Sequence, residues 1–275
     1  MLISRREFLA TAAAGAAAIT GPGVYAETDP WRGLKVGVHT YSVRKLSFAE
    51  AVSSTAGFGL KHIGFNPVHV PLESSPGEID AAKAACAKAG LEVMAIGVVG
   101  FSEPDEKFGK QVFEFAKRMG MHAISANPEA KALPMLNEMV KHYDIRIAIH
   151  NHGPDSLFQK PEDLLRAVEP YDERIGACAD IGHYERSNVR AEAALKALRG
   201  RVYDMHLKDV DVPKKEGKSV VLGTGIVDFE AVFAELLEQK FQGHVALEYE
   251  AEADAPLASM KKCFDYAKSV LAKLA

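Results

Sequence analysis

Residues 62–97 read HIGFNPVHVPLESSPGEIDAAKAACAKAGLEVMAIG and contain one complete strand–helix–strand unit. His62–Phe65 and Glu92–Gly97 are short apolar runs with the length and composition of buried strands. Between them, Glu78–Ala89 repeats its apolar residues at helical spacing, and Gly90 follows as a residue that ends helices. This order predicts two parallel strands joined by a helical crossover.

The same unit recurs along the chain at intervals of about thirty residues. Eight strands are predicted, at Lys35–Thr40, His62–Phe65, Glu92–Gly97, His122–Ala126, Arg146–His150, Ile175–Asp180, Val202–Leu207 and His244–Tyr249. Further helices are predicted at Phe108–Met119, Asp163–Val168, Ala191–Leu198 and Phe229–Gln239; Gly120 closes the first and Asp228 caps the last. Eight such repeats favour an α/β protein with a single-domain (β/α)8 TIM barrel over an open sheet.

The first 26 residues, MLISRREFLATAAAGAAAITGPGVYA, predict an export signal that lies outside the fold. Arg5 and Arg6 precede an Ala-rich apolar stretch, a pattern that resembles the twin-arginine type of signal. We therefore expect a periplasmic protein whose barrel occupies residues 33–275.

The remaining composition narrows the class of protein. The formal net charge is −4 at pH 7, which supplies no basic field for a nucleic-acid backbone. No other stretch approaches the roughly twenty apolar residues of a bilayer span, so we expect no stable membrane insertion once the signal is removed. The three cysteines, Cys86, Cys178 and Cys263, have no metal-type spacing and are predicted to be buried free thiols. Whether the protein forms a homo-oligomer stays open.

Polar side chains gather at the ends of the last four predicted strands. These ends carry His150 and His152, Asp180 and His183, His206 and Lys208, and Glu248 and Glu250. Alternate residues of a strand share a face, and reactive groups of α/β barrels collect at the carboxyl ends of strands. We therefore expect these side chains to converge at one mouth of the barrel.

Two imidazoles and two carboxylates suit a borderline-to-hard divalent metal ion: Mn first, with Zn, Co or Mg as alternatives. Taken singly, any of these histidines could be a packed core residue. Taken together, His150, Asp180, His206 and Glu248 predict a metal site, although whether His150 or His152 is the ligand stays open.

Other polar residues near predicted strand ends are candidates for the pocket wall. His39 and Tyr41 follow the first strand, Asn66 the second and Asn127 the fourth. Arg186 follows the sixth strand and is placed to reach an anionic or polyhydroxyl substrate. Each of these has a plain alternative as a packing or surface residue.

These residues resemble the sugar phosphate isomerase/epimerase superfamily of xylose-isomerase-like barrels, over nearly all of the chain after the signal. The marks are Asp180-x-x-His183, His206-x-Lys208-Asp209 and Glu248, and residues 223–229 are similar to the family's loop before the seventh helix. The His-Asn-His-Gly-Pro run at 150–154 resembles a separate branch, whose exported members are linked to 3-keto sugars and glycosides.

The resemblance implies a metal held by Asp180, His206 and Glu248, and a hydrogen bond from His183 to a substrate oxygen. Members of the ketose-epimerase type have a glutamate at the end of strand five, where this chain has His150. Because a metal-bound histidine is a poor second base, this departure argues against simple two-base epimerisation of a free ketose.

The expected chemistry is proton abstraction next to the carbonyl of a small carbohydrate, giving an enediolate. Glu248 is the expected base, and His183 and Lys208 are expected to return the proton or to protonate a departing oxygen. His39, His152, His183, Lys208 and Glu250 are the expected substrate contacts. The outcome is isomerisation, epimerisation or, if a β-substituent leaves, lysis.

Three alternatives stay open at this stage. Lys208 could be a structural partner of Asp209 or Asp180. The chain could be an exported, non-catalytic sugar-binding barrel. It could also be a phosphodiesterase of the related endonuclease barrel, although the charge and the export signal count against that class.

Overall fold

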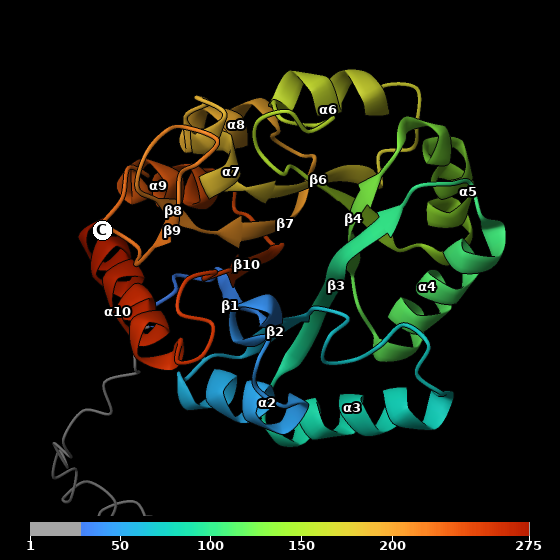
Figure 1. The fold of residues 1–275 in the computed structure, drawn as a ribbon, viewed down its shortest axis with the longest axis horizontal. Helices are drawn as coiled ribbons and strands as arrows, with labels where there is room; N and C mark the ends of the chain where they lie inside the picture. The colour runs from blue at the N-terminus through green and yellow to red at the C-terminus, as the bar shows by residue number, and fades with distance from the viewer. Residues whose placement is uncertain (1–28, 275) are drawn as a thin grey trace, which may run out of the picture.

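The computed structural model describes residues 29–274, and their parallel strands close into a barrel (Figure 1). Around the barrel the strand order is β1-β10-β7-β6-β5-β4-β3-β2. The bounds are β1 Lys35–His39, β2 His62–Phe65, β3 Glu92–Phe101, β4 Ala123–Pro128, β5 Arg146–His150, β6 Ile175–Asp180, β7 Val202–Leu207 and β10 His244–Leu247. The predicted (β/α)8 barrel is confirmed.

Helices surround the barrel and cover the outer faces of the strands (Figure 1). They are α2 Phe48–Gly57, α3 Pro76–Lys88, α4 Glu106–Met119, α5 Leu133–Tyr143, α6 Pro161–Val168, α7 Ile181–Arg186, α8 Ala191–Ala197, α9 Phe229–Glu238 and α10 Leu257–Lys273, with short 3₁₀ turns at Thr40–Val43 (η1) and Ala130–Ala132 (η2). Their apolar stripes pack on the strands in one continuous hydrophobic core.

Helix ends follow the capping signals of the sequence. Ser75 begins α3 with a capping box to Glu78, so this helix starts two residues before the predicted Glu78. Gly120 ends α4 in the left-handed conformation, with φ +83°, and the Asp228 side chain accepts a hydrogen bond from the Ala231 N–H at the start of α9. The five predicted helices are confirmed within a few residues.

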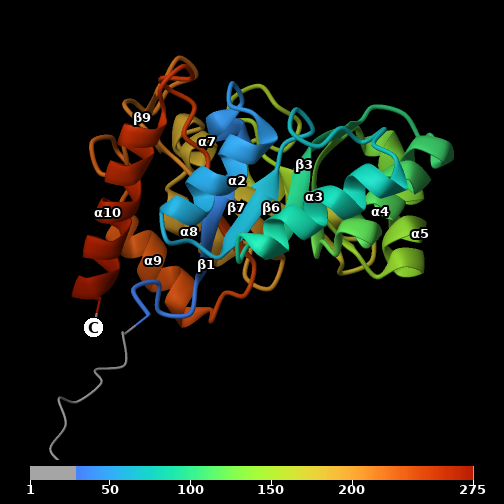
Figure 2. The same cartoon turned by 90° about the horizontal axis from the view of Figure 1, so that it is seen from below.

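Two features of the carboxyl end of the barrel were absent from the prediction. The short helix α7 starts directly after β6, and an antiparallel hairpin of β8 (Asp209–Val210) and β9 (Ser219–Val220) follows β7. Figure 2 places β9 at the upper end of the barrel, opposite the end at which the chain enters β1. Both additions therefore belong to the mouth where strands end.

Strand eight ends earlier than predicted. The β10 ladder stops at Leu247, so Glu248 and Tyr249 lie just beyond it. The three cysteines are buried and free, as expected. Within residues 29–274 there is no helix of the length and apolarity required to cross a bilayer. The predicted export signal at 1–26 lies outside the described residues.

Candidate active site

Four neighbouring strands bring the predicted ligands together. His150 ends β5, Asp180 ends β6, His206 lies in β7, and Glu248 directly follows β10. Asp180 pairs in register with His206, and His206 with Ala246, two residues before Glu248. Since neighbouring strands run about 4.8 Å apart, residues at matching heights face one point inside the mouth.

The four side chains form one buried cluster. Each offers a nitrogen or oxygen atom that lies within 4.8 Å of the others. His150 Nε2 lies 3.0 Å from His206 Nδ1, and His206 Nδ1 lies 3.1 Å from Glu248 Oε2. Asp180 Oδ2 lies 3.5 Å from His150 Nε2. None of the four residues is more than 5 % exposed.

This donor set fits a divalent cation. Two imidazole nitrogens and two carboxylate oxygens converge on one another instead of on solvent, and Asp180 Oδ2 is buried without an aligned hydrogen-bond donor. Its charged neighbour is the Lys208 ammonium, 2.8 Å away, and a divalent ion would offset the remaining negative charge of the two buried carboxylates. Such oxygen and nitrogen donors are those that Mn²⁺, Zn²⁺ or Mg²⁺ accept.

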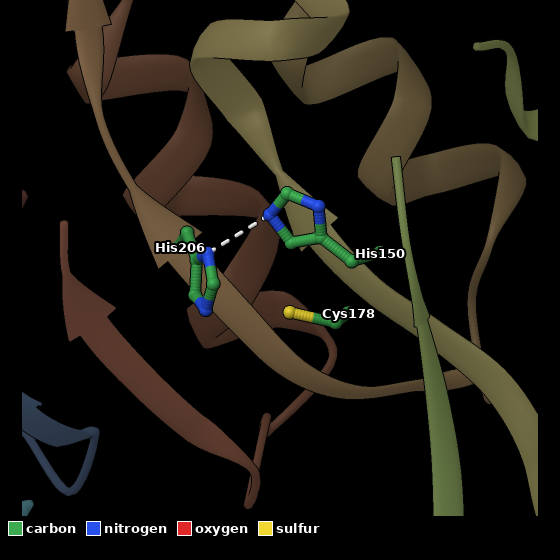
Figure 3. Close-up of side chains that lie close together, drawn as sticks. All are labelled: His150, Cys178 and His206. Atoms are coloured by element: carbon green, nitrogen blue, oxygen red, sulfur yellow. Dashed lines mark hydrogen bonds between the residues drawn. The ribbon is translucent and has the colours of Figure 1, made fainter. Parts of the chain in front are cut away.

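A second donor set shares the two imidazoles but replaces the carboxylates by a thiol. Figure 3 shows Cys178 of β6 below the contact between His150 and His206. Burial raises the pKa of the Cys178 thiol to about 12, so the thiolate that a soft metal requires is disfavoured. The carboxylate set is therefore the better site.

Lys208 holds the two carboxylates from the other side. Its buried Nζ lies 2.8 Å from Asp180 Oδ2, 2.8 Å from Glu248 Oε2 and 3.3 Å from Glu250 Oε1. Burial opposes the ammonium charge, but the carboxylates of Asp180 and Glu248 prevail and raise the pKa of Lys208 above its ordinary value. The predicted alternative of an ion pair with Asp180 is thus present in the structure.

The other predicted partner of Lys208, Asp209, has a separate task. Its carboxylate accepts hydrogen bonds from the backbone N–H groups of Gly223 (2.9 Å), Gly225 (2.9 Å) and Val227 (3.1 Å). These bonds fold the 223–228 segment against the start of the hairpin. Asp209 therefore fixes a loop at the mouth and does not neutralise Lys208.

The surroundings of Glu248 and His150 shift the pKa of both side chains. Burial works against the charge of Glu248, but His206 and Lys208 hold its pKa well below the usual range. Burial lowers the pKa of His150 to about 4, although Asp180 opposes this. Glu248 is thus held as a carboxylate and His150 as a neutral imidazole, the forms that a base and a ligand require.

Arg186 reaches His183 instead of open solvent. Its NH1 donates to His183 Nδ1 at 3.1 Å, and its NH2 donates to the carbonyl oxygen of Lys215 in the hairpin loop. Burial lowers the pKa of His183 well below its usual value. Arg186 and Lys208 can both only donate, and the Arg186 contact is the shorter one, so it favours Nδ1 as the acceptor and the proton on Nε2. That nitrogen lies 3.5 Å from Lys208 Nζ.

A cavity of about 180 Å³ opens above the cluster. It is smaller than the roughly 300–1,000 Å³ of pockets for drug-sized ligands, which suits a small molecule. Its lining comprises His39, Tyr41, Asn66, Val98, His150, His152, His183, Glu248 and Glu250. Lys208 lies directly beneath the two glutamates.

The remaining candidates divide into those at the cavity and those away from it. His39 Nδ1 lies 2.9 Å from Glu248 Oε1, so this imidazole touches the expected base. His152 lines the cavity and contacts His150, Nδ1 to Nδ1, at 3.3 Å, but it is outside the four-residue cluster. Asn127 is exposed and does not line the cavity.

Asn151 is a structural residue that the sequence reasoning missed. Its side-chain amide donates to the Asp180 carbonyl oxygen at 2.9 Å and accepts from the Asp180 N–H at 2.8 Å. The two bonds imitate a pair of strand hydrogen bonds beyond the end of β5 and fix the backbone of Asp180. The signal in the sequence was an asparagine between two candidate ligands, His150 and His152.

Comparisons with known proteins agree with the barrel fold. A family model described as "Xylose isomerase-like TIM barrel" matches residues 55–269. A protein named inosose dehydratase from Mesomycoplasma hyopneumoniae (strain 7448) is 28 % identical over 163 residues, covering 52 % of this chain and 53 % of that protein. The chain thus spans about half the length of the curated relatives it matches.

Solved structures repeat the fold at lower sequence identity. An L-ribulose 3-epimerase superimposes with a TM-score of 0.71 and 14 % identity, over 88 % of this chain and 95 % of that one. A 3-keto-D-glucoside 4-epimerase from E. coli superimposes with a TM-score of 0.70 and 16 % identity, over 86 % and 99 %. At these identities the likeness shows the fold alone.

Proposed function

Because the chain belongs to the xylose isomerase-like TIM barrel family, we propose that it is a divalent-metal-dependent enzyme that removes a proton next to the carbonyl of a small keto sugar or keto polyol. The observation that carries this proposal is the buried cluster of His150, Asp180, His206 and Glu248 beneath a small cavity. The sequence relatives named as inosose dehydratases support the same reaction class.

The four clustered residues would hold the metal, with Mn²⁺ as the first choice. When bound, the ion would polarise a substrate carbonyl and acidify the neighbouring C–H bond. His150 presents a neutral ring nitrogen to this position, and Asp180 presents a buried carboxylate oxygen. The donor set has no ionised thiol, which favours a harder ion over copper(I).

Glu248 is the group best placed to accept the proton. Its Oε2 faces the ligand cluster, its Oε1 lies against His39, and the residue lines the cavity. Its contacts with His206 and Lys208 keep it ionised. A carboxylate at the edge of the cavity is within reach of a substrate carbon bound above it.

His183 and Lys208 are the candidate proton donors. The Arg186 contact leaves the proton of His183 on Nε2, 3.5 Å from Lys208 Nζ. Delivery of the proton to carbon completes an isomerisation or epimerisation. Delivery to a departing hydroxyl or alkoxide, with loss of the β-substituent, completes a dehydration or lysis.

A test follows the exchange of a C–H proton. The Mn-loaded protein is incubated in D₂O with 3-keto-glycosides, free ketoses and inosose, and deuterium incorporation and products are followed by NMR. Deuterium next to the carbonyl is expected for one substrate class, and it should vanish in Glu248→Gln but persist in Glu73→Gln, a control at an exposed glutamate. Sugar binding without exchange by any substrate would support a non-catalytic barrel instead.

We also propose that residues 1–26 direct export to the periplasm by the twin-arginine route. The support is the Arg5-Arg6 pair before an Ala-rich apolar run. Fusion of residues 1–26 to a folded reporter should place the reporter in the periplasm, and Arg5→Lys/Arg6→Lys should keep it in the cytoplasm. Export that is unaffected by the double substitution would argue against the route.

A further inference from the structure

A second cavity lies at the opposite, amino end of the barrel and has a volume of about 380 Å³. Its polar lining is Lys35, His122, Arg146, Tyr203, Gln242 and His244. Lys35 begins β1, Arg146 begins β5 and His244 begins β10, so the cavity is the mouth at which strands start. His244 is the first residue of β10 and Glu248 lies four residues further along, so the two are separated by roughly 13 Å at about 3.3 Å per residue.

Two cations face this cavity without a carboxylate partner. Within residues 29–274, neither Lys35 nor Arg146 lies within 4.0 Å of an acidic side chain, although other exposed lysines and arginines do, such as Arg118 with Asp80. The Arg146 guanidinium stacks over the Tyr203 ring, 5.1 Å from its centroid. The stacking restricts the side chain and leaves its N–H groups free to bind.

A buried histidine forms the inner wall of the cavity. His244 is 2 % exposed, and neither ring nitrogen makes an aligned hydrogen bond, although Nδ1 lies 3.5 Å from Asp204 Oδ1. Its ring occupies space that Gly37 and Gly64 leave open, since a Cβ at Gly37 would collide with it. The Nε2 atom therefore lies against Gly37, and His244 closes the inner end of the cavity without presenting a free donor to it.

The acidic groups around the cavity are few and already engaged. Asp204 lies behind His244, with Oδ1 3.5 Å from Nδ1, and its Oδ2 accepts a hydrogen bond of 2.5 Å from Ser125. Glu92 lies 3.2 Å from His122 and 3.6 Å from His62. The lining itself therefore offers positive charge and N–H donors, and no carboxylate.

We propose that this amino-end cavity binds a phosphate-type oxyanion, either free or as the phosphate group of a small metabolite. Arg146 and Lys35 supply the charge, because a guanidinium fork matches the oxygens of a tetrahedral anion. The side-chain amide of Gln242 supplies a further donor at the rim. The volume of the cavity leaves room for more than the anion alone.

Calorimetric titration of the full chain with inorganic phosphate, sulfate and glucose 6-phosphate tests this site, with sodium chloride as the blank. Saturable binding is expected, and Arg146→Gln and Lys35→Gln should each weaken it by about tenfold. Arg166→Gln, at an exposed arginine of α6, is the matched control and should bind as the unmodified chain does. In NMR spectra, the ring protons of His122 and His244 should shift on binding.

Two results would overturn the proposal: no saturable binding, or equal affinity in Arg146→Gln and the unmodified chain. Binding that is lost in Arg186→Gln but kept in Arg146→Gln would place the anion at the carboxyl end instead, and would also count against it. Equal affinity for phosphate and glucose 6-phosphate would identify the free anion as the ligand. Tighter binding of the sugar phosphate would identify the phosphate group as one part of a larger ligand.

Discussion

The barrel has two contiguous halves that differ in chemistry although they share one architecture. Strands β5, β6, β7 and β10 lie side by side and supply the four clustered residues and Lys208. Strands β1 to β4 complete the ring, and of their residues His39 alone makes an ion-pair contact with the cluster. The reactive groups are therefore concentrated because four adjacent strands, about 4.8 Å apart, each end in a polar side chain.

The largest loss of activity is expected for a substitution of Glu248. Glu248→Gln keeps the size of the side chain but removes the charge that accepts the proton. Turnover should fall by about 10²–10⁴-fold, the usual contribution of a general base. Steady-state kinetics with the substrate found by deuterium exchange measures the loss, and a variant that retains full turnover would place the base elsewhere.

Lys208 tests whether charge stabilises the half of the barrel formed by β5, β6, β7 and β10. Lys208→Met leaves Asp180 and Glu248 buried without their cation, so the metal-free protein should lose about 3–5 kcal/mol of unfolding free energy. Added Mn²⁺ should restore much of the stability, because an ion that binds only the folded state stabilises it.

Urea unfolding with and without Mn²⁺ measures both effects. Lys131→Met, which removes an exposed ion pair with Glu103, is the control and should cost at most about 1 kcal/mol. A stability of Lys208→Met that matches the unmodified chain would show that Lys208 is not needed to neutralise the carboxylates.

Arg186, the last residue of α7, tests how His183 is oriented at the mouth of the barrel. Arg186→Gln removes the obligatory donor to His183 Nδ1 and frees the ring to adopt either tautomer. We expect turnover to fall by about 10–100-fold, as for other residues that orient a functional histidine. Nitrogen-detected NMR of the His183 ring should report mixed tautomers, a change that simple loss of stability would not produce.

Tyr41 represents the other half and should give the smallest effect. It lines the cavity just after β1, and its hydroxyl is the polar group that it offers to a ligand. Tyr41→Phe should raise KM by a few-fold, roughly 1 kcal/mol for one hydrogen bond, with kcat unchanged. Tyr171→Phe, away from the cavity, is the control; a large loss of kcat in Tyr41→Phe would contradict the division into two halves.

The barrel could be predicted because its signals are local. Apolar strand runs, helical stripes and capping residues such as Asp228 are read within a few positions of the chain, and the structure places these elements within a few residues of the prediction. The short helix α7 was missed because Asp180 was interpreted as a ligand alone, whereas its side chain also accepts from the His183 N–H and caps this helix.

The site could be predicted as a set of side chains but not as a network. Spacing identified the clustered residues, since strand ends meet at one mouth. It could not show that Arg186 turns back onto His183, that His39 touches Glu248, or that Lys208 chooses Asp180 over the adjacent Asp209. The contact of His39 with Glu248 joins residues far apart in sequence. The contacts of Arg186 and Lys208 depend on which rotamer each side chain adopts. The local sequence pattern predicts neither kind of contact.

The two hydrogen bonds of Asn151 have a consequence for how the sequence can drift over evolution. The side chain must donate to the Asp180 carbonyl and accept from its N–H at once, as a peptide group does. Aspartate lacks the donor, leucine lacks both, and glutamine is one methylene too long. We therefore expect position 151 to tolerate almost no exchange in descendants that keep the geometry of Asp180, although Asn151 itself is outside the four-residue cluster.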